Sequence, residues 1–127
     1  MALLLIVDDD HQVAILFARV LKREGYQVEI AFDCESALQT MAASNRQFDG
    51  VLLDLCMPGA DGLAFLRQLR DAPKHKSTPV AVITGNHMMN ERTEAELRQL
   101  GAIVRFKPLW PDDFGRIART LVTASHP

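Results

Sequence analysis

The chain of 127 residues has little of what marks secreted, membrane-spanning or nucleic-acid-binding proteins. Its two cysteines, Cys34 and Cys56, are too few for a disulfide framework. The apolar start from Ala2 to Val7 is stopped by three aspartates, so it is too short for a signal peptide or a membrane span. With 14 basic and 16 acidic residues, the net charge of −2 argues against a dedicated nucleic-acid binder. We therefore expect one domain in a reducing, cytoplasmic compartment, with no direct contact to nucleic acid or membrane.

Short apolar runs alternate along the chain with the spacing of helices. The run Leu3–Val7 is typical of a strand covered on both faces. After it, apolar residues three and four positions apart predict a helix that ends at Gly25, with a buried stripe of Val13, Leu16, Phe17, Val20 and Leu21. The other expected strands are Val28–Ala31, Val51–Leu53, Pro79–Ile83 and Ile103–Phe106. Helices are expected over about Glu35–Ser44, around Leu63–Leu69, up to Leu100 and after Pro111. This alternation predicts an α/β domain with a parallel sheet and helices on both faces.

Residues that can carry chemistry follow four of the five predicted strands. They are Asp8, Asp9 and Asp10 after the first strand, Asp54 after the third, Thr84, Gly85 and Asn86 after the fourth, and Lys107 after the fifth. In an open parallel sheet, ligands bind beyond the carboxyl ends of the strands. The sequence therefore predicts that these groups meet at one edge of the sheet.

Each of these residues also has an ordinary structural interpretation. Asp9 or Asp10 could cap the following helix, and Asp54 could form a turn with its own backbone. Thr84 could end its strand with a local hydrogen bond, and Lys107 could be a solvated charge. These separate roles do not explain why all four strand ends carry such groups.

The charges expected at this edge favour a divalent cation. Asp8, Asp9 and Asp54 bring three negative charges, which oppose one another's ionisation. Lys107 brings one positive charge, which leaves two negative charges that a divalent cation would cancel. Mg²⁺ suits such a site because it prefers one or two carboxylates together with water and phosphate. A carboxylate nucleophile, a metal, a cation and hydroxyl or N–H donors are the groups that phosphoryl transfer requires. We therefore expect phosphoryl acceptance on a carboxylate, with Mg²⁺ as the cofactor.

In these residues the chain resembles the receiver domain of two-component response regulators. The matching motifs are Leu5–Asp10, Leu53–Gly62, Val82–Gly85 and Phe106–Pro108, in the order of the family. The resemblance implies a single receiver domain over residues 1–127, with a flavodoxin-like (βα)5 doubly wound sheet of strand order 2-1-3-4-5. It also implies a signalling switch rather than a dedicated enzyme, although such a domain catalyses its own phosphorylation and slow hydrolysis.

The resemblance assigns Asp54 as the residue that accepts a phosphoryl group from a sensor histidine kinase or a histidine phosphotransfer protein. It implies that Asp9 and Asp54 ligate Mg²⁺ directly, that Cys56 does so through its backbone carbonyl, and that Asp8 acts through water. The phosphoryl contacts would be Thr84, the backbone N–H of Gly85 and Lys107. Two further positions, Cys56 and Asn86, are those at which the family tunes the lifetime of the phosphoryl group.

The chain departs from the family pattern at Val104, where the family usually has Tyr or Phe as a switch residue. Either the switch is transmitted differently, or Phe106 or Trp110 substitutes; for Phe106 we favour a simple packing role. Gly85 stands where the family prefers alanine. The four histidines lack the spacing of metal ligands, and we expect them at the surface.

Phosphorylation is expected to change the surface formed by the helix that ends at Leu100, the strand Ile103–Phe106 and the last helix. An output domain, a downstream protein or a second copy in a phosphorylation-dependent homodimer would bind there. The first alternative is a pseudo-receiver, an interaction domain with an altered or absent switch. A phosphatase of the haloacid dehalogenase type would need a second aspartate where Cys56 stands, and a flavodoxin-like flavin protein would need a Ser/Thr-rich phosphate loop after the first strand.

Overall fold

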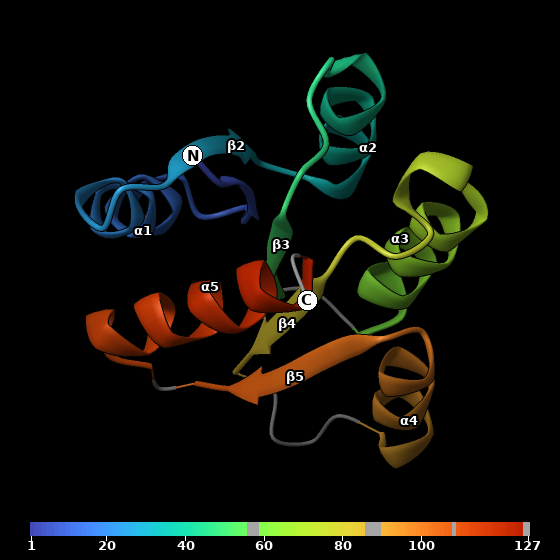
Figure 1. Cartoon of the computed structure of the whole chain (residues 1–127). Coiled ribbons are helices and arrows are strands. Elements are labelled where there is room, and N and C mark those ends of the chain that lie inside the picture. Colours follow the sequence, from blue (N-terminus) through green and yellow to red (C-terminus); the bar gives the residue numbers. More distant parts are fainter. Residues whose placement is uncertain (56–58, 86–89, 108, 126–127) are drawn as a thin grey trace.

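The computed structural model describes residues 1–55, 59–85, 90–107 and 109–125, and in this part of the chain five strands alternate with five helices (Figure 1). The strands are β1 (Leu3–Val7), β2 (Gln27–Ala31), β3 (Gly50–Leu55), β4 (Val80–Thr84) and β5 (Ala102–Phe106). The helices are α1 (His11–Arg23), α2 (Cys34–Ala43), α3 (Gly59–Asp71), α4 (Glu91–Gln99) and α5 (Pro111–Ser125), and the short 3-10 helix η1 (Pro73–His75) precedes β4. Within these ranges, no helix combines the length and the apolar character that crossing a bilayer requires.

The strands form one parallel sheet in the order β2-β1-β3-β4-β5, which confirms the predicted architecture. From β1 the chain first builds outward to β2 and then returns to add β3 on the other side of β1. The strand order therefore reverses between β1 and β3, which is where open α/β sheets place their ligands.

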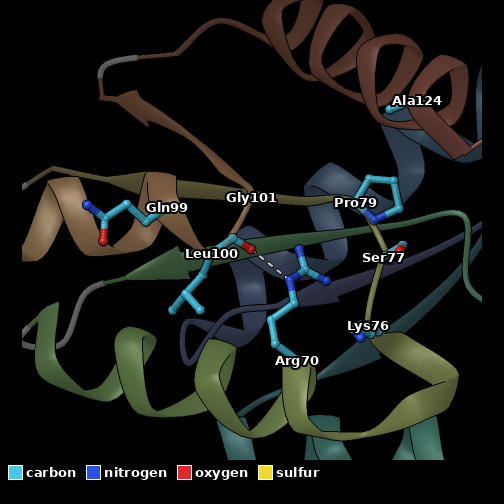
Figure 2. A pocket seen from close by; sticks show the side chains of 8 residues that line it. All are labelled: Arg70, Lys76, Ser77, Pro79, Gln99, Leu100, Gly101 and Ala124. Carbon is cyan, nitrogen blue, oxygen red and sulfur yellow. Dashed lines mark hydrogen bonds between the residues drawn. The ribbon is translucent and has the colours of Figure 1, made fainter.

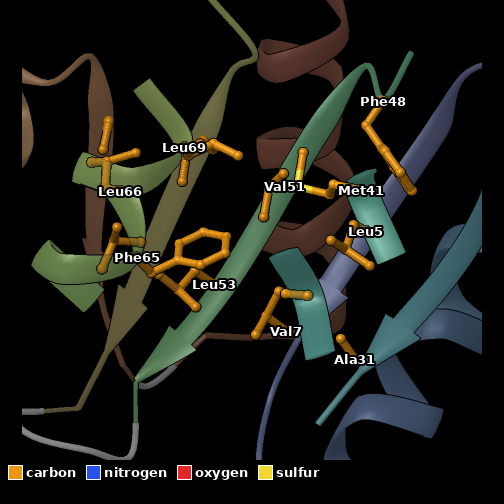
Figure 3. Packing of buried hydrophobic residues seen from close by; sticks show 14 of the residues in the cluster. Leu5, Val7, Ala31, Met41, Phe48, Val51, Leu53, Phe65, Leu66 and Leu69 are labelled. Carbon is orange, nitrogen blue, oxygen red and sulfur yellow. The ribbon is translucent and has the colours of Figure 1, made fainter. Parts of the chain in front are cut away.

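Two hydrophobic cores cover the two faces of the sheet. On one face, α2, α3 and α4 pack against Leu5, Val51 and Leu53 and the strand residues in line with them (Figure 3). On the other face, α1 and α5 pack against Leu4 and Leu52 and their neighbours. Because alternate residues of a strand point to opposite faces, burial of both faces explains why these strands are continuous apolar runs.

The buried face of α1 matches the predicted stripe only in part, since Leu21 is buried and Val13, Phe17 and Val20 are half-buried. Its buried residues are Ala14, Ala18 and Leu21, whereas Leu16 is 54% exposed. Ala14 and Ala18 lie in the core on this face, and the sequence stripe of larger apolar residues did not include them. The predicted end of the helix is confirmed, since Gly25 has a φ of +99°, in the left-handed region that favours glycine.

His75 is buried, so the expectation that the histidines lie at the surface is wrong at this position. Only 5% of the residue is exposed, and its Nδ1 lies 3.4 Å from the hydroxyl of Thr78. Burial lowers the pKa of His75, and the charge of Lys74 lowers it further. The sequence carried no signal for this burial because η1 breaks the helical periodicity there. His87 and His126 lie outside the described residues.

We expect the protein to lose stability as the pH falls through the range in which His75 is protonated in the unfolded chain. The folded state keeps His75 neutral, so below a pH of about 6.5 the unfolded state binds more protons and gains relative stability. In the variant His75→Gln, urea unfolding at about pH 7 and about pH 5 should show a smaller difference in the free energy of unfolding than in the parent. The same pH dependence in both proteins would contradict this assignment.

Candidate functional site

Asp8 and Asp54 come together at the carboxyl edge of the sheet. In the pairing of β1 with β3, Val7 lies opposite Leu53, so the residue that follows each of them is carried to the same edge. Both side chains are deeply buried, since Asp8 is 1% and Asp54 3% exposed. Two carboxyl groups from strands far apart in the sequence are thus held near each other and away from bulk water.

The surroundings of Asp8 disfavour its ionised form. Burial is the main cause that raises the pKa of Asp8 to about 7, and the neighbouring carboxyl group of Asp54 acts in the same direction. The backbone N–H of Asp10, which donates to Oδ1 of Asp8 at 2.9 Å, and the charge of Lys107 both lower this pKa but do not cancel the effect of burial. Without a cation, the pair therefore resists carrying two full negative charges near neutral pH.

Lys107 brings the positive charge to this site. Its Nζ lies 2.8 Å from Oδ1 of Asp54, and a third of the side chain is exposed. The backbone N–H of Lys107 donates to the carbonyl of Thr84 at 2.8 Å, which holds the residue just beyond the end of β5. The lysine is therefore paired with the buried carboxylate and is not simply a solvated charge.

Thr84 ends β4 beside the two strands that carry Asp54 and Lys107. It lies opposite Leu55 of β3 and Phe106 of β5, and only 1% of it is exposed. Gly85 follows at the surface, and a Cβ at this position would lie 3.6 Å from Cδ of Lys107, so the glycine lies along the lysine side chain. The edge thus unites a hydroxyl, two carboxyl groups and an ammonium from four strands.

The other two aspartates of the predicted site are exposed. Asp10 caps α1, since its Oδ1 accepts a hydrogen bond from the backbone N–H of Val13 at 3.1 Å, as one of the sequence interpretations proposed. In the part of the chain that the structure describes, no three acidic, histidine or cysteine side chains form a group that could hold a metal ion. Asp9 is exposed beside the buried Asp8, and its role as a metal ligand stays a prediction.

The predicted switch and tuning positions have different outcomes. Val104 is a core residue, 2% exposed and packed on the face covered by α2, α3 and α4. Phe106 is 37% exposed and is not a core residue, so any packing role that it has lies at the surface. Trp110 is 73% exposed. Cys56 and Asn86 lie outside the described residues.

Asp8 and Asp54 have carboxylate oxygens that could bind a cation. Within the described ranges, neither Oδ2 of Asp8 nor either carboxylate oxygen of Asp54 accepts a hydrogen bond, and the contact of Lys107 with Asp54 is an ion pair. Buried polar atoms in proteins are nearly always partnered. Carboxylate oxygens of this kind suit Mg²⁺, which binds through one or two carboxylates and retains several waters. The two carboxyl groups therefore offer the oxygen ligands that a magnesium ion requires, although they do not form a complete set of ligands by themselves.

The rings of His11 and Phe32 stack at the same edge, a contact that the sequence analysis missed. Their centroids are 3.7 Å apart with an interplanar angle of 16°. The pairing of Val7 with Ala31 brings the start of α1 next to the residue that follows β2. Only this register relates the two residues, because they are separated by a helix and a strand.

Comparisons with family models, curated proteins and solved structures all find response regulators. Residues 4–113 match the family model of the response regulator receiver domain. The response regulator MprA of Mycobacterium sp. (strain KMS) is 40% identical over 89 residues, which are 70% of this chain and 37% of MprA. The matched region thus spans little more than a third of that relative's length.

Two solved structures share the fold over almost their whole length. The chemotaxis response regulator CheY4 of Vibrio cholerae has a TM-score of 0.81 and 27% identity, covering 95% of this chain and 98% of that one. The response regulator TrrA of Thermotoga maritima, in complex with Mg²⁺ and BeF, has a TM-score of 0.77 and 26% identity, covering 95% and 99%.

Proposed function

The chain belongs to the response regulator receiver domain family, and we propose that it is a phosphorylatable switch of a two-component histidine–aspartate relay in which Asp54 accepts the phosphoryl group. The observation that carries this proposal is the buried carboxylate of Asp54, paired with Lys107 at 2.8 Å and adjoined by Asp8. Domains of this family are signalling domains and not dedicated enzymes. The proposal treats residues 1–127 as one receiver domain.

The proposed reaction moves a phosphoryl group from a phosphohistidine to Asp54. An oxygen of the carboxylate attacks the phosphorus while the P–N bond breaks, and the electron pair leaves with the imidazole, which takes up a proton. The product is an acyl phosphate on Asp54. Water later attacks the phosphorus, which releases inorganic phosphate and restores the carboxylate.

The donors at the ends of β4 and β5 would receive the new charge. Phosphorylation adds about −1.5 to −2 charges, and we assign the phosphoryl contacts to the hydroxyl of Thr84, the backbone N–H of Gly85 and the ammonium of Lys107. Because Lys107 already lies against Asp54, it holds the carboxylate before the transfer and offsets the phosphoryl charge after it.

Receiver domains bind Mg²⁺, and the TrrA structure contains this ion together with BeF. In this chain we assign its binding to Asp9 and Asp54, the backbone carbonyl of Cys56 and, through water, Asp8. When bound, the ion supplies positive charge that offsets the carboxylates and the phosphoryl oxygens. Oδ2 of Asp8 and Oδ2 of Asp54, which accept no hydrogen bond within the described residues, support this assignment.

The output of the switch would pass through the surface of α4, β5 and α5. Thr84 and Lys107 lie at the ends of the two strands that lead to these helices, so a shift of either residue toward the phosphoryl group reaches that surface. We propose that an output domain, a downstream protein or a second copy of the chain binds there. Val104 would replace the usual aromatic switch residue, and Cys56 and Asn86 would set the lifetime of the acyl phosphate.

We expect the protein to take up one phosphoryl group from acetyl phosphate when millimolar Mg²⁺ is present, and EDTA to reduce the uptake to background. The reason is that the like charges of Asp8 and Asp54 and of the incoming phosphate oppose the reaction unless a cation compensates them. Mass spectrometry of the intact protein measures the uptake. Hydroxylamine should remove the group, since it cleaves acyl phosphates.

Two results would contradict the proposed function. No uptake, either from acetyl phosphate or from a panel of phosphorylated histidine kinases with Mg²⁺ present, would favour a pseudo-receiver that acts only as an interaction domain. Uptake that resists hydroxylamine would place the phosphoryl group on a residue other than an aspartate.

A further inference from the structure

A hollow of about 440 Å³ lies at the amino edge of β4 and β5, the opposite end of the sheet from Asp54 (Figure 2). Its wall combines the end of α3 at Arg70, the turn after η1 at Lys76 and Ser77, and the end of α4 at Gln99 and Leu100. The end of α4 is far in the sequence from the other two segments, and none of the three has a part in the proposed phosphorylation site.

Arg70 places a partly unused guanidinium in this wall. Its Nε donates to the carbonyl of Leu100 at 2.7 Å (Figure 2). Its Nη1 donates to the carbonyls of His75 at 3.0 Å and Thr78 at 2.7 Å. Nη2 makes no hydrogen bond within the described residues, and it faces Gly101, where a Cβ would lie 3.4 Å away.

All the partners of Arg70 are neutral carbonyls, so its charge has no carboxylate partner in the described part of the chain. Burial lowers the pKa of the guanidinium because the charged form loses water, but arginine remains charged in proteins. A half-buried cation without a counterion attracts an anion from solution more strongly than an exposed one does.

A second hollow of about 410 Å³ continues the first, because Lys76, Ser77, Pro79 and Ala124 line both. It adds Lys74, whose Nζ donates to the carbonyl of Ser44 at 2.6 Å. Lys76 is exposed, and its side chain makes no hydrogen bond or ion pair within the described ranges. The two hollows together form what we call the basic groove, and the described residues that line it include three cations and no acidic side chain.

We propose that the basic groove binds an extended acidic segment of a partner protein, with carboxylates at Nη2 of Arg70 and at Lys76. The cations are spread along two joined hollows, which suits a ligand with several charges along its length better than a single small anion. Small-molecule sites enclose most of the surface of their ligand, whereas Lys76, Ser77, Gln99, Gly101 and Ala124 are all exposed. The groove is also distant from the acidic edge, so a segment bound there leaves Asp54 accessible.

Fluorescence anisotropy with a labelled, glutamate-rich peptide tests the proposal on the full chain. Lys76→Gln removes one cation without removing any observed contact, and we expect it to weaken binding by about fivefold, the effect of one partly exposed ion pair. The matched control is Arg92→Gln, because Arg92 is an exposed cation at the opposite end of α4 and should leave the affinity unchanged. Lys76 is preferred over Arg70, whose removal would also break three structural hydrogen bonds.

Backbone amide NMR locates the bound peptide. We expect the amide signals of Ser77 and Gly101 to shift and that of Gly85, at the acidic edge, to remain in place. Equal affinity in the Lys76→Gln variant, shifts confined to the acidic edge, or no binding would overturn the proposal. Titration with pyrophosphate separates the two sources of negative charge: if it shifts Ser77 and Gly101 and the peptide does not, the groove binds a small phosphate ligand instead. None of these readouts depends on phosphorylation of Asp54, so they can fail while the proposed function stands.

Discussion

Asp54→Asn loses phosphoryl uptake from acetyl phosphate, by at least about two orders of magnitude, because the amide cannot replace the carboxylate as the nucleophile. Asparagine has nearly the same size and shape, so the buried position stays filled. Its amide oxygen can still face Nζ of Lys107, which lies 2.8 Å from the carboxylate in the native protein. The change therefore removes the reactive group while keeping its surroundings. Mass spectrometry of the intact protein, with Mg²⁺ present, measures the loss.

A second aspartate variant controls for the loss of one negative charge. Asp71 is exposed at the end of α3, away from the acidic edge, and Asp71→Asn should be labelled like the parent. Circular dichroism spectra of both variants should match that of the parent. Undiminished labelling of Asp54→Asn would refute Asp54 as the acceptor, and equal loss in both variants would attribute the effect to net charge.

Asp8→Asn raises the stability of the metal-free protein and at the same time weakens its response to Mg²⁺. The pKa of Asp8 is raised to about 7, chiefly by burial, so at pH 8 the folded state holds a carboxylate that its surroundings disfavour. Replacing it with a neutral amide should stabilise the protein by on the order of 2 kcal/mol, or roughly 5 to 10 °C in Tm. Asparagine retains an oxygen that can accept the N–H of Asp10, as Oδ1 of Asp8 does.

The gain from Asp8→Asn should depend on pH in a defined direction. Between the ordinary pKa of 3.8 and about 7, the unfolded chain releases the proton of Asp8 while the folded chain keeps it. The stability contributed by this group is therefore largest at low pH and is lost as the pH rises through about 7. Thermal unfolding in EDTA should show a clear difference between parent and variant at about pH 8 and little difference at about pH 5.

Addition of Mg²⁺ should reverse the order of the two proteins. A ligand that binds only the folded state raises Tm, and the parent retains the carboxylate assigned to the ion whereas the variant does not. Asp71→Asn again serves as the control and should follow the parent under both conditions. A variant that is less stable than the parent in EDTA at pH 8 would show that the charge of Asp8 is well compensated in the native protein.

Much of the fold could be predicted from local patterns. Runs such as Leu3–Val7 and Val51–Leu53 predict buried strands because both of their faces are covered, and the helices between them require a parallel sheet. The carboxyl ends of parallel strands share one edge, so the chain positions of Asp54, Thr84 and Lys107 are enough to predict that they meet. The structure confirms that meeting because β3, β4 and β5 are neighbours in register.

Features that depend on how one element packs against another could not be predicted. Leu16 belongs to a helical apolar pattern and is nevertheless exposed, whereas Ala14 and Ala18 of the same helix lie in the core. His75 follows a helix in a polar segment and is nevertheless buried. Asp9 and Asp8 are adjacent in sequence, but only Asp8 lies in the interior beside Asp54.

The amino-acid order alone thus established the succession of strands and helices, the edge at which the acidic and basic groups gather, and the small net charge that disfavours a nucleic-acid binder. The first two properties follow from short-range periodicity and from the geometry of parallel sheets, and the third follows from the composition. The depth of burial of Asp8, its raised pKa, and the groove around Arg70 at the opposite edge required the folded chain. The reason is physical: desolvation and charge pairing depend on distances between segments remote in sequence, and only the packed structure sets those distances.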